Sequence, residues 1–140
     1  GTGVTLAGLW AGFHLLGSPV RMLGIDVGKL WRTFPASIAR LASDVCGLLG
    51  QPHHFSANEV PMIEKAYVGE GYAQLRAEAV AAIGRLARLE GVVLDPVYSG
   101  KAFAGLLDLV GNGRFAPDAQ IIFLHTGGLP GLWPYADQMG

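Results

Sequence analysis

The chain has 140 residues, of which 51% are apolar and 15% are charged, and its formal net charge is −1. This length fits one ordinary domain with a sizeable core. The balanced charge excludes the basic surface that nucleic-acid binding needs. The single cysteine excludes an internal disulfide and fits a reducing compartment. No apolar run reaches the roughly 18 residues of a membrane span, and no basic segment opens a signal peptide.

The chain opens with Gly1-Thr2-Gly3-Val4-Thr5, a pattern typical of a loop between a strand and a helix. We therefore expect a fragment whose preceding strand lies outside it. Small residues allow backbone N–H groups to approach an anion, and a helix N-terminus adds positive potential. The segment predicts a phosphate site, and the alternative is a tight turn in which Thr5 caps the helix.

Helical and extended segments alternate along the chain. Four segments have the apolar spacing of helices: 6–16, 29–49, 76–90 and 101–110. Four shorter segments are predicted to be extended: 20–25, 59–67, 92–94 and 121–124. We expect the second helix to begin near Pro35, because proline fits a first helical turn, and the third to end at Gly91.

Helices that alternate with short, wholly apolar strands are typical of a mostly parallel sheet with helices on both faces. The predicted fold class is therefore α/β, with three layers. Ligands of such sheets bind beyond the carboxyl ends of the strands. Three glycine- and hydroxyl-rich loops, 1–5, 95–100 and 125–128, follow predicted strand ends and are expected at the same edge.

Several polar residues in these loops have both a chemical and a structural interpretation. Tyr98 is a candidate general acid or base, or a tyrosine that covers the core. Ser99 is a site residue or a helix cap. Tyr72, between glycines, lines a site or anchors a loop. His125 is a site residue or a hydrogen-bonded structural histidine.

No metal site is predicted. His53 and His54 are adjacent, so in an extended loop their side chains point apart and chelate poorly. Cys46 lies on a predicted helix beside Val45 and is expected in the core.

Read together, these loops resemble one family. The segments that carry the resemblance are Leu94-Asp95-Pro96-Val97-Tyr98-Ser99-Gly100-Lys101-Ala102, His125-Thr126-Gly127-Gly128, Gly1-Thr2-Gly3-Val4-Thr5-Leu6-Ala7-Gly8-Leu9 and Gly71-Tyr72. In this order they are similar to the C-terminal half of the D-cysteine desulfhydrase and 1-aminocyclopropane-1-carboxylate deaminase family. That family comprises pyridoxal-phosphate enzymes with the tryptophan-synthase-β-like fold. The resemblance covers nearly the whole chain and implies that residues 1–140 form the C-terminal part of the cofactor-binding domain.

The resemblance also implies the roles of particular residues. The cofactor phosphate would be held by Thr2, Gly3, Val4 and Thr5. Tyr98 and Tyr72 would flank the substrate as catalytic or positioning groups, and Ser99 would face the pyridine nitrogen. Thr126 and Gly127 would pack near the ring. The full-length protein would be a cytoplasmic homodimer that acts on a small amino acid and binds neither nucleic acid nor membrane.

Ser99 bears on the reaction. Deaminases of the family carry a glutamate at this point, which keeps the pyridinium protonated and strengthens the electron sink. A hydroxyl favours a neutral nitrogen, which suffices when a good leaving group departs from Cβ. The resemblance therefore implies β-elimination from a sulfur-containing amino acid, giving pyruvate, ammonia and sulfide, or sulfite from cysteate. The alternatives are the deaminase and a non-catalytic module that binds a phosphate ligand.

Two residues and one motif depart from the family pattern. Val4 and Ala73 stand where glycine is usual. The asparagine-lysine motif that tethers the cofactor is not in this chain, and we assign the Schiff base to none of Lys29, Lys65 and Lys101. The chain alone is expected to be inactive.

Overall fold

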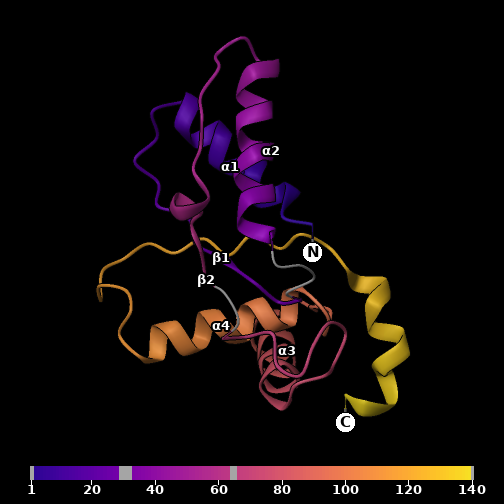
Figure 1. The fold of residues 1–140 in the computed structure, drawn as a ribbon. Helices are drawn as coiled ribbons and strands as arrows, with labels where there is room; N and C mark the ends of the chain where they lie inside the picture. Colours follow the sequence, from indigo (N-terminus) through magenta and orange to yellow (C-terminus); the bar gives the residue numbers. More distant parts are fainter. Residues whose placement is uncertain (1, 29–32, 64–65, 140) are drawn as a thin grey trace. The chain divides into compact units, whose positions relative to one another are not determined.

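The computed structural model describes residues 2–28, 33–63 and 66–139. The chain divides into two compact units (Figure 1). The first comprises Gly1–Gly24 and Lys29–Glu64, and the second comprises Ile25–Gly28 and Lys65–Gly140. We describe each unit by itself.

Two helices form the first unit, α1 over Val4–Leu15 and α2 over Phe34–Leu48. They pack against each other through a core in which small alanine side chains allow a close approach. Ile38 and Cys46 are fully buried there, as expected for Cys46. The core consists of Ala7, Ala11, Phe34, Ile38, Ala39, Ala42, Cys46 and Phe55.

Both helices of the first unit begin near the predicted positions. Thr33 precedes α2, and Pro35 lies in the first turn of the helix, because a proline needs no N–H partner there. The alternative in which Thr5 caps α1 is wrong. Gly3 precedes the helix with φ +78°, and a Cβ at this residue would lie 2.5 Å from Cγ1 of Ile38. A glycine therefore makes this turn possible.

The only sheet in the described residues has two short strands, β1 over Gly24–Ile25 and β2 over Met62–Ile63. The Gly24 N–H donates to the Pro61 carbonyl at 2.6 Å. The strand predicted over 20–25 is thus confined to its end. Of the extended segment predicted over 59–67, residues 64 and 65 lie outside the described residues and Met62–Ile63 form β2. Glu59 instead belongs to the 3₁₀ helix η1, Ala57–Glu59, which it closes in a capping box with Ser56.

The second unit contains helices α3 over Ala77–Glu90 and α4 over Ser99–Gly111, which pack against each other. Gly91 ends α3 with φ +67°, as predicted. A C-terminal 3₁₀ helix, η2, covers Leu129–Gln138, a segment for which no element was predicted. The α3 residues buried in this unit are Ala79, Ala82 and Ile83.

The prediction of strands over 92–94 and 121–124 is wrong, because neither segment forms a strand in the structure. Their composition is that of buried strands, but a strand exists only where a neighbour supplies backbone partners. Within the described residues no segment pairs with them. Val92 is 40% exposed and Ile122 is 90% exposed, so these apolar side chains lie open.

Candidate functional site

The carboxylate of Asp95 organises the loop before α4. It accepts hydrogen bonds from the backbone N–H groups of Val97, Tyr98 and Ser99 at 2.8–2.9 Å. Asp95 is fully buried, and three amide donors satisfy its charge. The carboxylate therefore fixes the backbone that carries Tyr98 and Ser99, and its bond from the Ser99 N–H satisfies the first amide of α4.

Ser99 is the first residue of α4 and is 4% exposed. Its hydroxyl donates to Oδ1 of Asp95 at 2.5 Å and accepts from the Asp95 N–H at 2.9 Å. Ser99 therefore does not cap the helix, because it is the first helical residue itself and Tyr98 is at the N-cap. If the hydroxyl turns to another acceptor, the three amide donors still hold the carboxylate.

The two tyrosines predicted to flank the substrate lie together. The hydroxyl groups of Tyr72 and Tyr98 form a short hydrogen bond, and their ring centroids are 5.8 Å apart. Tyr72 is 44% exposed, whereas Tyr98 is half-buried. The hydrogen bond to Tyr72, followed by burial and by the charges of Tyr72 and Asp95, raises the pKa of Tyr98 to about 12. The Tyr98 phenol therefore stays protonated at neutral pH.

The loop after residue 124 lies against the Asp95 turn. Nδ1 of His125 accepts from the Gly127 N–H at 3.1 Å, so Nε2 carries the proton and donates to the Val93 carbonyl at 3.3 Å. A Cβ on Gly128 would lie 2.7 Å from Oδ1 of Asp95. His125 therefore has the structural role, Gly127 lies in this loop, and Thr126 is exposed beside it.

The predicted phosphate loop belongs to the first unit. Thr2, Val4 and Thr5 are exposed at the start of α1, where Gly3 has no side chain to cap the helix. The Gly3 carbonyl accepts from the Ala7 N–H at 2.9 Å, so the amides of the first turn stay without helical partners. Exposed amides, two threonine hydroxyls and the helix dipole suit a phosphate.

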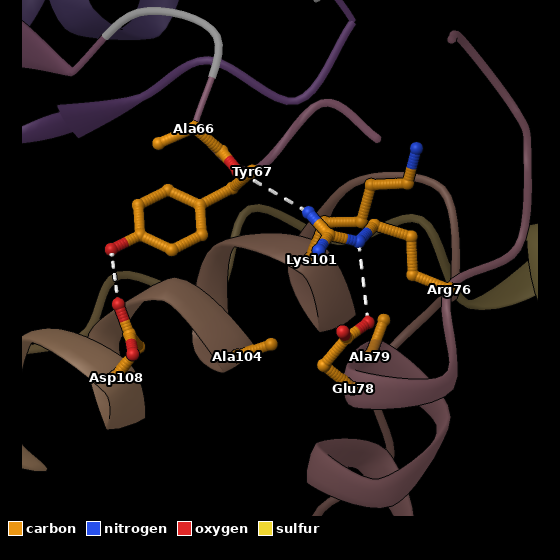
Figure 2. A pocket seen from close by; sticks show the side chains of 8 residues that line it. All are labelled: Ala66, Tyr67, Arg76, Glu78, Ala79, Lys101, Ala104 and Asp108. Atoms are coloured by element: carbon orange, nitrogen blue, oxygen red, sulfur yellow. Dashed lines mark hydrogen bonds and ion pairs between the residues drawn. The ribbon is translucent and has the colours of Figure 1, made fainter. Parts of the chain in front are cut away.

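A pocket of about 270 Å³ opens in the second unit (Figure 2). Arg76 donates to Glu78 and to the Ala66 carbonyl, both at 3.3 Å, and Tyr67 donates to Asp108 at 2.8 Å. The residues that line it are Ala66, Tyr67, Arg76, Glu78, Ala79, Lys101, Ala104 and Asp108. Two cationic residues, Arg76 and Lys101, and two acidic residues, Glu78 and Asp108, line this pocket. None of the predicted site residues lines it.

Lys101 contributes its stem to this pocket, and Figure 2 shows its ammonium directed away from the carboxylates of Glu78 and Asp108. The residue is 1% exposed, and Nζ donates to the carbonyls of Val68 at 2.9 Å and Gly71 at 3.0 Å. Burial, followed by the nearby charge of Arg76, lowers the pKa of Lys101. Lys29 and Lys65 lie outside the described residues.

Other polar groups of the described chain form no separate site. The rings of His53 and His14 stack at 3.8 Å, and His53 also contacts Phe55. Across residues 2–28, 33–63 and 66–139, no group of three or more metal-binding side chains comes together. Every helix in this part of the chain is too short or too polar to cross a bilayer.

Sequence reasoning missed three residues that shape the site. Asp95 precedes a helix by a few residues, a spacing at which a carboxylate can accept from backbone amides. Tyr135 donates its hydroxyl proton to the Ala73 carbonyl at 2.7 Å, a contact 62 positions apart that no local signal reveals. Lys101 sits in an amphipathic pattern, but nothing in that pattern distinguishes a buried ammonium from an exposed one.

Comparison with known proteins gives a consistent result. Residues 1–127 match the family described as pyridoxal-phosphate dependent enzyme. The chain is 36% identical to a 1-aminocyclopropane-1-carboxylate deaminase of Burkholderia vietnamiensis, over 97% of this chain and 40% of the relative. It is also 36% identical to a D-cysteine desulfhydrase of Yersinia enterocolitica, over 99% of this chain and 41% of the relative.

A solved structure, described as that of an ACC deaminase homologue, matches 99% of this chain and 41% of its own. The TM-score is 0.87 and the identity is 34%, which confirms the predicted α/β class. The chain thus spans about two fifths of the length of these relatives. The predicted resemblance is confirmed, and pyridoxal phosphate is the cofactor that the family's description names. The chain belongs to the family of pyridoxal-phosphate dependent enzymes.

Proposed function

We propose that the protein containing this chain is a lyase that performs β-elimination on a sulfur-containing amino acid and releases pyruvate and ammonia. The observation that carries the proposal is the hydroxyl of Ser99 at the start of α4, where the deaminases that the chain resembles have a carboxylate. The sulfur would leave as sulfide from cysteine, or as sulfite from cysteate.

The residues present fit the cofactor. Thr2, Gly3, Val4 and Thr5 would hold its phosphate through backbone and hydroxyl donors at the start of α1. Ser99 would face the ring nitrogen, and Thr126 and Gly127 would pack near the ring. When bound, pyridoxal phosphate supplies the electron sink for bond breaking at the amino acid.

Tyr98 and Tyr72 would take part in proton transfer beside the substrate. With a pKa raised to about 12, the Tyr98 hydroxyl stays protonated at neutral pH and is present there as a hydrogen-bond donor. Tyr72, hydrogen-bonded to Tyr98 and half-exposed, would orient the Tyr98 hydroxyl and replace the proton that it gives up, regaining its own from solvent. Lys101 is not proposed as the tether of the cofactor, since two carbonyls hold its ammonium.

Product identity tests the proposal. The full-length protein, loaded with pyridoxal phosphate, is offered D-cysteine, L-cysteine, cysteate and 1-aminocyclopropane-1-carboxylate in separate reactions. Keto acids are separated as hydrazones, and sulfide and sulfite are measured directly. We expect pyruvate with sulfide or sulfite. Formation of 2-oxobutyrate from the cyclopropane substrate, without pyruvate from the others, would establish the deaminase instead.

A lack of turnover has its own interpretation. If the full-length protein binds pyridoxal phosphate stoichiometrically but converts none of the four compounds, the non-catalytic binding module replaces the lyase. The isolated 140-residue chain is expected to give no keto acid with any of them.

A further inference from the structure

The segment that carries Tyr72 has little secondary structure of its own. Residues 68–73 form turns and a bend. At the end of this stretch the Gln74 N–H donates to the Gly71 carbonyl over a long distance, 3.4 Å. Ala73 has φ +59°, a conformation that costs energy for any residue with a Cβ. Local sequence therefore does not account for the place of the Tyr72 hydroxyl.

Side chains from elsewhere hold this segment on both sides of Tyr72. On its N-terminal side, Nζ of Lys101 donates to the carbonyls of Val68 and Gly71. On its C-terminal side, the Tyr135 hydroxyl donates to the Ala73 carbonyl at 2.7 Å. The two anchors come from different elements, α4 and η2.

The Lys101 anchor connects the segment that carries Tyr72 to the helix that follows Tyr98. Lys101 lies on the first turn of α4, three residues after Tyr98, so it ties the Tyr72 segment to the element that positions Tyr98. A buried ammonium is unfavourable unless hydrogen bonds satisfy it, and the two carbonyls do so. Because the Nζ atom is directed away from the pocket carboxylates (Figure 2), an ion pair with Glu78 or Asp108 does not explain it.

We propose that Lys101 and Tyr135 are positioning residues that hold the Tyr72 hydroxyl against Tyr98 by anchoring the main chain before and after Tyr72. This inference rests on the proposed function, in which the tyrosine pair transfers protons. It extends the site to a buried lysine and to the C-terminal helix.

A kinetic double-mutant cycle in the full-length protein tests the positioning role. Lys101→Met keeps the aliphatic stem and removes the donors, and Tyr135→Phe removes one hydroxyl. We expect kcat to fall by about 10²-fold for Lys101→Met, because small displacements of a reacting group have effects of that size, and by about tenfold for Tyr135→Phe. KM should change little. In a Tyr72→Phe background, both changes should lower kcat no further.

Asn112→Ala is the control, because it removes a side-chain hydrogen bond of the same unit, to Asp108, that does not involve the Tyr72 segment. It should leave kcat unchanged. If Lys101→Met and Tyr135→Phe lower kcat equally in the wild-type and Tyr72→Phe backgrounds, the anchors act on stability alone and the proposal is overturned. Tyr135→Phe keeps the test decisive if Lys101→Met does not fold.

A second readout needs no turnover. With ¹³C-labelled tyrosine, the Tyr98 resonance is identified from its loss in Tyr98→Phe. At pH 10.5 it should remain that of a protonated phenol in the wild type and Asn112→Ala, and shift toward the phenolate in Tyr72→Phe, Lys101→Met and Tyr135→Phe. Unchanged Tyr98 titration in both anchor variants overturns the inference even if the lyase is confirmed. A shift in a protein without lyase activity supports it while the proposed function fails.

Discussion

At the scale of single residues, Asp95 accepts more hydrogen bonds than any other side chain of the site. Replacing it with alanine would leave three buried amides and the Ser99 hydroxyl without their acceptor. We expect Asp95→Ala to lower the free energy of unfolding by about 3 kcal/mol, since each unsatisfied buried donor carries a desolvation cost. Urea unfolding of the full-length protein measures this loss.

Ser99→Ala is the control for that measurement. It removes one hydroxyl but leaves the three amide donors on the Asp95 carboxylate, so we expect it to cost only about 1 kcal/mol. Equal losses for the two variants would show that the carboxylate does not organise the loop.

The titration of Tyr98 predicts a dependence of stability on pH. Its folded pKa of about 12 lies above the ordinary value of 10.0, so the folded state binds the proton more tightly. The resulting stabilisation is complete below pH 10 and is lost as the pH rises through about 12. In Tyr72→Phe the largest cause of the shift is gone, and we expect the pKa of Tyr98 to move toward 10. Stability curves from pH 8 to 12 that coincide for the two proteins would contradict this.

The residues of the site differ in how far sequence could predict them. Tyr98 and Ser99 are candidates because they follow an apolar segment, Tyr72 because glycines flank it, and Gly127 through the family resemblance. All four lie in the second unit. The partners that hold them could not be predicted in this way. Tyr135 and Ala73 meet only because η2 folds back, and pairwise tertiary contacts leave no periodic trace.

At the scale of elements, Ala73 is the one described non-glycine residue with a positive φ, and the family that the chain resembles usually has glycine there. We expect Ala73→Gly to raise the free energy of unfolding by about 1 kcal/mol, because glycine relieves the left-handed strain. Thermal or urea unfolding measures the gain. The matched control is Ala81→Gly, in the exposed interior of α3, which should cost about 1 kcal/mol. A loss at both positions would show that residue 73 is unstrained.

Helices were predicted well and strands poorly, for a physical reason. The bonds of a helix join residues four apart, so α2, α3 and α4 follow from apolar spacing, proline and glycine in their own segments. The bonds of a strand join distant segments. The apolar stretches 92–94 and 121–124 have the right composition, yet their pairing depends on neighbours that no local pattern specifies.

At the scale of the whole molecule, the 140 residues form two units with separate cores. The candidate phosphate loop belongs to the first unit, and the tyrosine pair, Ser99 and the 125–128 loop belong to the second. The roles proposed for both groups of residues therefore rest on the family relationship and not on the composition. Net charge and length alone would have fitted many classes of enzyme.

The alkylation rate of the buried Cys46 thiol measures how often the core of the first unit opens. Cys46 is the single cysteine among these 140 residues and is fully buried, so an alkylating reagent reaches it only when the α1–α2 core opens. Under reversible opening, its labelling rate reports the opening equilibrium. Weakening that core by Ile38→Val, at a cost of about 1 kcal/mol, should speed labelling by about fivefold.

The corresponding change in the other unit, Ile83→Val, should leave the rate unaltered if the units open separately. Mass spectrometry of the peptide that contains Cys46 would follow the reaction in the full-length protein. Equal acceleration by both variants would instead mean that the two units open as a single cooperative body. One sulfur atom thus reports whether the two units share their stability.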